Sequence, residues 1–306
     1  MLKSFFVVLL LIHAATAVAV PFASRYALVV EEGSGKVLLS KNADIEVPIA
    51  SLTKLMTAMV VLDAQSDMEE LITIEDPSLL ANMQSKTRLT DGGLLPRRTV
   101  LELALMSSDN HAAASLAYAF PGGVDAFLKA VAAKTNELGM THTHIEEPTG
   151  LSKANRSTAE DLARMAAAAA SYPEIVRITT SSGTTVDVEG RSVEYHNTNS
   201  LVGQDGWDIL LSKTGFTIPA GRCLIMRLKA GEQTIIVVLL NATNLPSRMA
   251  DALNVRRYLA GEPPLPAKAE PQYRSRRLAR MAPTKARRTA SVMSAPLVEA
   301  PTFRFR

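Results

Sequence analysis

The order of strand-like and helix-like segments constrains the fold of this chain more than any other feature of its sequence. Two short apolar runs, residues 26–30 and 37–39, flank a turn and predict a hairpin. Three further strand-like runs come late in the chain, at residues 207–212, 222–228 and 234–240. Strands joined by short links pair antiparallel, and helix-like segments separate the two groups. The sequence therefore predicts an α+β fold, with helices packed on an antiparallel sheet.

The middle of the chain is rich in Ala, Leu and Met, which favour helix. The expected helices cover residues 52–64, two segments within 100–120, residues 124–138 and residues 158–171, with a closing helix over residues 246–260. The four polar residues 107–110 interrupt the second stretch and predict a joint between two helices. After Pro173 the mixture of Thr, Ser, Val and Gly over residues 176–193 predicts strands and turns.

Composition excludes several classes of protein. The 306 residues are 47% hydrophobic and 21% charged, which is typical of a globular chain and excludes a wholly disordered, collagen-like or coiled-coil protein. Cys223 is the only cysteine, so neither a disulfide framework nor a cysteine metal cluster is expected. Aromatic residues make up 5%, too few for a protein that binds nucleic acid by stacking.

The two ends of the chain differ from its body. Residues 1–19 combine Lys3, an apolar run and small residues up to Ala19, which predicts a cleaved export signal. Residues 20–262 are expected to form the folded domain. Residues 263–306 are rich in Pro, Ala and Arg and predict a flexible basic tail. Residues 267–306 carry a net charge of +8, which leaves −5 for the first 266 residues.

Ser51 and Lys54 lie one helical turn apart at the expected start of the helix over residues 52–64. A serine hydroxyl becomes a strong nucleophile when a base takes its proton, and a lysine can be that base when burial or a nearby cation lowers its pKa. Taken alone, Ser-x-x-Lys is more often a capping serine with a solvated lysine. It indicates catalysis only when other residues support it.

Two further triplets supply that support. Ser108-Asp109-Asn110 lies in the polar joint between two helices, and Lys213-Thr214-Gly215 follows the strand expected to end at Ser212. On their own these triplets are typical of a helix cap and of a strand end with a turn glycine. Ser-x-x-Lys, Ser-Asp-Asn and Lys-Thr-Gly in this chain order are the motif set of the active-site-serine β-lactamases and penicillin-binding proteins.

With these motifs the chain resembles the D-alanyl-D-alanine carboxypeptidase/endopeptidase family of low-mass penicillin-binding proteins. The resemblance covers residues 26–259. Segments whose sequence is similar to that of the family lie at residues 50–59, 147–151, 197–199 and 213–224. Residues 106–116 and 118–123 are most similar to the short periplasmic D-alanyl-D-alanine endopeptidases. The larger carboxypeptidases of the family carry a second β domain and an anchoring helix, whereas here only the basic tail follows. The resemblance implies a β-lactamase/DD-peptidase-like fold, an antiparallel sheet flanked by helices with a helical subdomain.

The resemblance also implies a role for each matched residue. Ser51 would be the nucleophile, Lys54 its proton acceptor, and Ser108 the group that passes a proton to the leaving amine. Asn110, Lys213, Thr214 and Gly215 would bind substrate, with Lys213 lowering the pKa of Lys54 by repulsion. The backbone N–H groups of Ser51 and Phe216 would form the oxyanion hole. No cofactor is expected, and His142 and His144 are expected to be loop residues rather than metal ligands.

The implied function is hydrolysis of the D-alanyl cross-links between peptidoglycan stem peptides, in the periplasm, through an acyl-enzyme on Ser51. β-Lactams would be covalent inhibitors, released slowly because the chain has no Glu-x-x-Leu-Asn motif. The motifs leave two alternatives open: a D-alanyl-D-alanine carboxypeptidase and a catalytically silent muropeptide-binding protein. We expect no nucleic-acid partner, and at most a peripheral association of the basic tail with cell wall or membrane.

Overall fold

The computed structural model describes residues 20–81 and 85–265. The predicted export signal and all but the first three residues of the predicted tail lie outside the described residues. The strands, in chain order, are β1 (Tyr26–Glu31), β2 (Val37–Lys41), β3 (Val47–Pro48), β4 (Leu71–Thr73), β5 (Leu94–Pro96), β6 (Arg156–Ser157), β7 (Gly183–Val188), β8 (Arg191–His196), β9 (Ile209–Thr217), β10 (Gly221–Ala230) and β11 (Gln233–Ala242). The helices are η1 (Ala50–Leu52), α1 (Thr53–Asp63), α2 (Ser78–Ala81), α3 (Arg97–Met106), α4 (Asn110–Tyr118), α5 (Gly123–Glu137), α6 (Ala159–Ala169), α7 (Pro173–Thr180) and α8 (Leu245–Leu259).

A five-stranded sheet in the order β2-β1-β11-β10-β9 forms the centre of the fold. Every neighbouring pair in it is antiparallel, and the predicted hairpin of β1 and β2 is confirmed. The first strand pairs with the last, with Val29 opposite Val237, so the N-terminal hairpin completes a sheet built mostly from the end of the chain. This arrangement leaves β9 at one edge of the sheet.

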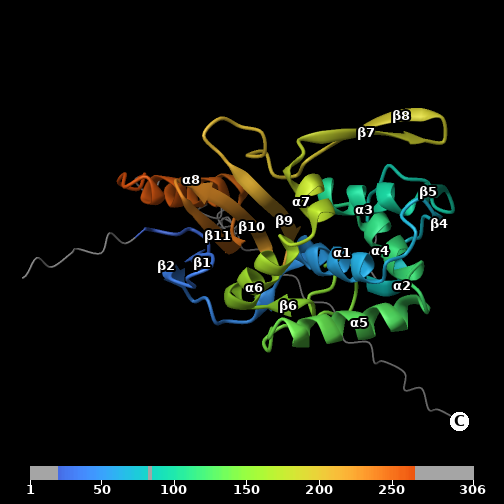
Figure 1. Cartoon of the computed structure of the whole chain (residues 1–306), viewed down its shortest axis with the longest axis horizontal. Helices are drawn as coiled ribbons and strands as arrows, with labels where there is room; N and C mark the ends of the chain where they lie inside the picture. The colour runs from blue at the N-terminus through green and yellow to red at the C-terminus, as the bar shows by residue number, and fades with distance from the viewer. Residues whose placement is uncertain (1–19, 82–84, 266–306) are drawn as a thin grey trace, which may run out of the picture. The chain divides into compact units, whose positions relative to one another are not determined.

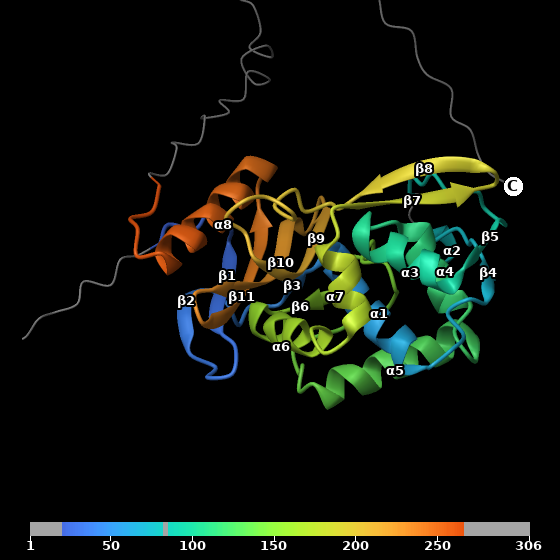
Figure 2. The same ribbon diagram turned by 45° about the horizontal axis from the view of Figure 1, so that its top comes forward.

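Side chains alternate between the two faces of the sheet, as expected for strands buried on both sides. On one face Leu28, Ile225 and Val238 belong to a large core that includes α1 and α6. On the other face Val29 and Val237 pack in a second core beneath α8. The sheet therefore lies between helices on both faces (Figures 1 and 2), which confirms the predicted α+β class.

The helical part of the fold is built around α1, which contacts α3, α4, α5 and α6. Residues 53–61 of α1 are all buried, because apolar side chains surround this helix on every side. The predicted polar joint between α3 and α4 is confirmed. There Asp109 caps α4 by accepting a hydrogen bond from the Ala112 N–H at 3.0 Å.

Two elements differ from the sequence-based prediction. Residues 173–180 form helix α7 rather than strands and turns. The β-branched residues favour strand, but Ile175, Ile178 and Thr179 fall on one helical face, which is buried in a helix that contacts α3 and β9. The strand expected to end at Ser212 continues to Thr217, so the Lys213 triplet lies inside β9 rather than after it.

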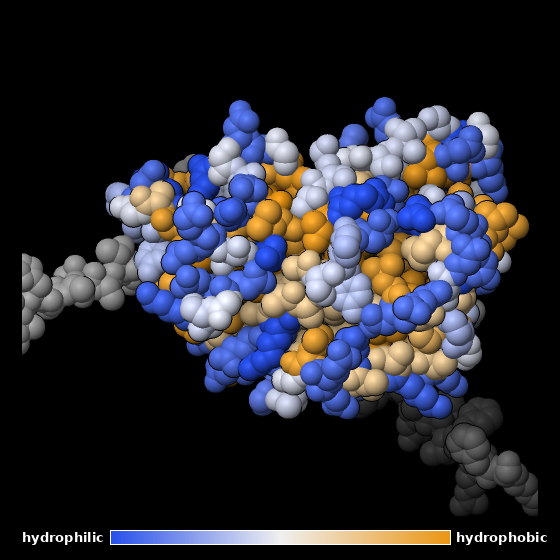
Figure 3. All heavy atoms as spheres, in the orientation of Figure 1, coloured by the Kyte–Doolittle hydropathy of each residue, from blue (hydrophilic) through white to orange (hydrophobic). Residues whose placement is uncertain are grey.

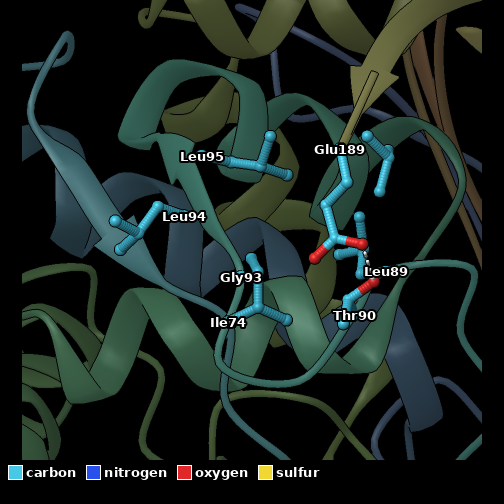
Figure 4. Close-up of a pocket in the computed structure, with 8 residues that line it drawn as sticks. Ile74, Leu89, Thr90, Gly93, Leu94, Leu95 and Glu189 are labelled. Atoms are coloured by element: carbon cyan, nitrogen blue, oxygen red, sulfur yellow. Dashed lines mark hydrogen bonds between the residues drawn. The ribbon is translucent and has the colours of Figure 1, made fainter. Parts of the chain in front are cut away.

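The β7–β8 hairpin packs beside the segment that precedes α3. At its turn, Glu189 accepts a hydrogen bond from the Thr90 hydroxyl at 3.0 Å (Figure 4). Further along the hairpin, the Arg88 guanidinium lies 3.9 Å from the ring centroid of Tyr195. These contacts fix the hairpin next to the joint between α3 and α4.

The surface mixes polar and apolar residues. On the face drawn in Figure 3, hydrophilic residues are spread over the surface, and apolar residues gather near its centre and at its right-hand edge. In residues 20–81 and 85–265 no helix is both long enough and apolar enough to cross a membrane.

Candidate active site

Ser51 lies in the 3-10 turn η1, directly before α1. Its neighbour Ala50 has a φ of 48°, a left-handed conformation that is uncommon for a residue with a side chain. Two glycines flank this turn. A Cβ on Gly150 would lie 2.0 Å from the Ala50 carbonyl oxygen, and one on Gly215 would lie 3.2 Å from the Ser51 nitrogen. The strained turn is therefore held between two backbone segments, of which the Gly150 segment approaches so closely that only glycine fits and the Gly215 segment leaves little room for a Cβ.

We expect Gly150→Ala to destabilise the protein by more than about 2 kcal/mol and to slow acylation of Ser51, because the new methyl group displaces the Ala50 carbonyl. The matched control is Gly139→Ala, whose φ of 64° is also positive but whose added Cβ meets nothing within 4 Å. That control is expected to lose only about 1 kcal/mol. Thermal unfolding and penicillin acylation rates check both variants, and equal losses would show that strain at φ, not the close approach, is the cause.

Lys54 is 1% exposed, and its Nζ contacts three oxygens. They are Ser51 Oγ at 3.0 Å, Asn110 Oδ1 at 2.6 Å and the Thr149 carbonyl oxygen at 2.6 Å. Asn110 Oδ1 and the Thr149 carbonyl can only accept hydrogen bonds, whereas a serine hydroxyl can also donate. A neutral lysine has two N–H groups for the first two partners and one lone pair for the Ser51 hydroxyl. When Lys54 is neutral, the same contacts allow its lone pair to accept the proton of the Ser51 hydroxyl.

Burial lowers the pKa of Lys54 to about 8, although the charges of Glu147 and Asp109 act in the opposite direction. A substantial share of Lys54 is thus neutral near physiological pH. The sequence led us to expect that repulsion from Lys213 would produce this shift. In the structure burial is the cause, and the charge of Lys54 instead adds to the burial that lowers the pKa of Lys213.

The joint between α3 and α4 brings Ser108 and Asn110 to the same site. Ser108 has a φ of 60°, and its Oγ accepts a hydrogen bond from Lys213 Nζ at 2.8 Å. Asn110 uses both ends of its amide, because its Nδ2 donates to Ser85 Oγ at 2.7 Å while its Oδ1 accepts from Lys54. The Ser108 triplet therefore meets the Lys213 triplet through the hydrogen bond from Lys213 to Ser108. It meets the Ser51 motif through the hydrogen bond from Lys54 to Asn110.

Lys213 is 1% exposed, although the sequence predicted that it follows the end of a strand. Its position inside β9, where residues 211–215 are all buried, explains the difference. Thr214 donates its hydroxyl proton to Thr198 Oγ1 at 2.6 Å. Since β9 is the edge of the sheet, an extended peptide could pair with its backbone beside these residues.

The structure adds one contact to Lys54 that the motifs did not reveal, from a loop over residues 147–155. The buried Glu147 carboxylate accepts hydrogen bonds from the Thr149 and Gly150 N–H groups at 2.7 and 2.6 Å. It also accepts from Asn155 Nδ2 at 3.0 Å. These bonds hold the Thr149 carbonyl against Lys54. The family-like sequence at residues 147–151 indicated that this loop matters, but it did not indicate which residue contacts Lys54.

The comparisons with known proteins agree with this geometry. Residues 13–244 match the peptidase S11 family, described as D-alanyl-D-alanine carboxypeptidase. A D-alanyl-D-alanine endopeptidase of Pseudomonas aeruginosa is 46% identical over 241 residues, which cover 78% of this chain and 77% of that protein. One of Escherichia coli is 40% identical over 275 residues, 88% of each chain.

A solved structure shows the same fold. Penicillin-binding protein D2 from Listeria monocytogenes, in an ampicillin-bound form, aligns with a TM-score of 0.65 and 27% identity. The alignment covers 76% of this chain and 95% of that one. The family expected from the motifs is thus confirmed. This chain belongs to the D-alanyl-D-alanine carboxypeptidase family, peptidase family S11.

Proposed function

We propose that this protein is a serine DD-endopeptidase that hydrolyses the D-alanyl cross-links of peptidoglycan and is acylated by β-lactams. The observation that carries the proposal is the contact of Lys54 Nζ with Ser51 Oγ at 3.0 Å, made by a lysine whose pKa burial lowers to about 8. The names of the relatives from P. aeruginosa and E. coli support the cross-link rather than the terminal D-alanine as the substrate.

In acylation, Lys54 accepts the proton of the Ser51 hydroxyl as Oγ attacks the carbonyl carbon of the D-alanyl residue. The backbone N–H groups of Ser51 and Phe216 are proposed to stabilise the oxyanion. The amine then leaves as the C–N bond breaks, and it needs a proton. We propose that the amine receives the proton that Lys54 accepted, so that Lys54 is neutral again for the second half-reaction. Ser108 is the proposed relay for this proton, and Lys213 Nζ holds the Ser108 hydroxyl in place by donating a hydrogen bond to its Oγ. The product of this half-reaction is an ester between Ser51 and D-alanine.

Water releases the acyl group in the second half-reaction. Glu147 is not available as a dedicated base for that water, because its carboxylate is buried and accepts hydrogen bonds on both oxygens. We therefore propose that Lys54 also activates the water and that a penicilloyl adduct on Ser51 is released slowly.

The acylation rate is expected to rise with pH up to about 8, where the pKa of Lys54 lies. Only neutral Lys54 can take the proton, so the rate should rise about tenfold per pH unit well below this pKa and level off above it. Stopped-flow measurement of penicillin acylation between about pH 5.5 and 9 checks this. A rate independent of pH over that interval would exclude Lys54 as the base.

A substrate comparison tests the proposed function. Purified protein is incubated with a cross-linked muropeptide dimer and, separately, with a monomeric pentapeptide, and products are separated by chromatography. We expect cleavage of the dimer to exceed release of terminal D-alanine. The reverse preference would favour the carboxypeptidase alternative. Labelling of Ser51 by penicillin without cleavage of either peptide would favour the binding-protein alternative.

The termini suggest where the protein acts. We propose export to the periplasm through residues 1–19 and attraction of the basic tail to anionic cell wall or membrane. A chain truncated after Leu265 is expected to keep full activity on soluble muropeptides. It should sediment less with isolated cell walls at low salt and equally at high salt, where screening removes the attraction. Equal sedimentation at low salt would show that the tail has no such role.

A further inference from the structure

An open cavity of about 230 Å³ lies beside Ser108, and no role has been assigned to it above. Three segments meet around it: the residues before β5, the joint between α3 and α4, and strand β8. Its walls include Lys86, Thr87, Arg88, Ser108, Asp109 and Tyr195. Since it adjoins Ser108, the cavity lies next to the proposed proton donor for the leaving amine.

The charged groups at the cavity favour an anion. Lys86 and Arg88 are exposed cations, and Asp109 is the carboxylate among the wall residues. The Asp109 carboxylate is already engaged, since it accepts from the Ala112 N–H at 3.0 Å and from the Thr87 hydroxyl at 2.7 Å. Behind Ser108, Lys213 contributes a further amine.

Arg88 is held in place for binding. Its Nη1 donates to the Glu194 carbonyl oxygen at 2.6 Å, and its guanidinium lies over the ring of Tyr195. The bond to Glu194 uses one of the five N–H donors of a guanidinium. An arginine positioned in this way can bind a carboxylate with little further loss of side-chain freedom.

Tyr195 provides an independent indication of a ligand. It is 1% exposed, and among the described residues its hydroxyl has no hydrogen-bond partner. A buried hydroxyl without a partner destabilises a structure by about 1–3 kcal/mol, so such a group calls for a partner. Burial raises the pKa of Tyr195, so the hydroxyl keeps its proton.

We propose that this cavity is the subsite for a carboxylate of the amine-side peptide, the part of the substrate that leaves when the bond to D-alanine breaks. The inference rests on the proposed function, because it takes Ser108 as the donor to the leaving amine. In a terminal D-alanine the amine side is a single residue with one carboxylate. In a cross-link the leaving amine belongs to a diamino acid that carries the rest of a second stem peptide. A cationic cavity beside Ser108 therefore offers the cross-link a contact on the side where a whole peptide has to be held.

The test uses two muropeptide dimers that differ only in the amine-side diamino acid, whose carboxyl group is free in one and amidated in the other. We expect the kcat/KM of the wild-type protein for the free-carboxyl dimer to be at least about fivefold higher than for the amidated dimer, mainly because KM is lower. In Lys86→Gln, and more fully in Lys86→Gln/Arg88→Gln, that ratio should fall towards one. The matched control is Arg191→Gln, an exposed arginine on the same hairpin outside the cavity wall, which should keep the wild-type ratio.

A binding measurement separates this inference from the proposed function. The amine-side peptide alone, with its carboxyl group free or amidated, is titrated by calorimetry into the Ser51→Ala protein, where no cleavage occurs. The subsite is supported if the peptide with the free carboxyl binds at least about fivefold more tightly than the amidated peptide, and if Lys86→Gln/Arg88→Gln removes this difference. That result would hold even if the wild type cleaves neither dimer. Equal affinity for the two peptides would overturn the subsite even if both dimers are cleaved.

Discussion

Ser51→Ala protein is expected to take up no penicillin and to lose peptidase activity by roughly 10⁴-fold or more, because the nucleophile is gone. Its fold should survive, since Ser51 is only partly buried and the variant keeps the Ala50 turn. The measurements are mass spectrometry of penicillin-treated protein, muropeptide cleavage and thermal unfolding.

The matched control is Ser107→Ala, which removes a hydroxyl from the α3–α4 joint that donates to the Leu103 carbonyl at 2.8 Å. This variant should still be labelled on Ser51. An adduct found on another residue of the wild type would disprove the assignment of Ser51.

Glu147→Gln is expected to destabilise the protein by about 2–3 kcal/mol and to slow acylation roughly 100-fold. Glutamine replaces one acceptor oxygen by an NH₂ group. Whichever way the amide is turned, that group then faces a backbone N–H, either of Thr149 or of Gly150. The loop would have to move, and the Thr149 carbonyl would no longer be held against Lys54.

The pH profile distinguishes this positioning role from a general loss of stability. The negative charge of Glu147 raises the pKa of Lys54, so its removal should lower that pKa and move the rising part of the acylation profile to lower pH. Glu146→Gln is the control, because Glu146 is exposed and its carboxylate accepts a hydrogen bond from the Ser152 hydroxyl. A Glu147→Gln protein with an unchanged profile would show that Glu147 acts only on stability.

The parts of the fold that could be predicted are those set by local pattern. The spacing of apolar residues predicted α1 and the hairpin of β1 and β2, and the polar residues 107–110 predicted the joint between α3 and α4. Helix α7 was missed because residues 176–180 have a strand-like composition, and the helix is stabilised by packing on distant segments. No local pattern contains that information.

The candidate site also has parts that the sequence predicted and parts that it did not. Three motifs predicted which residues would be brought together, and the structure places Lys54 with Asn110 and Ser108 with Lys213. The sequence did not predict that Glu147 positions the Thr149 carbonyl that accepts a hydrogen bond from Lys54. The contact between Lys54 and Thr149 joins residues that are far apart in the chain. The sequence also placed Lys213 at a strand end, since the continuation of β9 depends on pairing with β10.

The Ser51 turn is held by Gly150 from one loop and by Gly215 from β9, a strand that joins the sheet late in the sequence. The strand that closes the sheet on β1 comes later still, at Gln233–Ala242. A chain that is still being synthesised is therefore expected to lack a reactive serine. Reactivity towards β-lactams is for this reason a reporter of complete folding, and in a pulse-chase experiment it should appear only after residues 233–242 have been made and the sheet has closed.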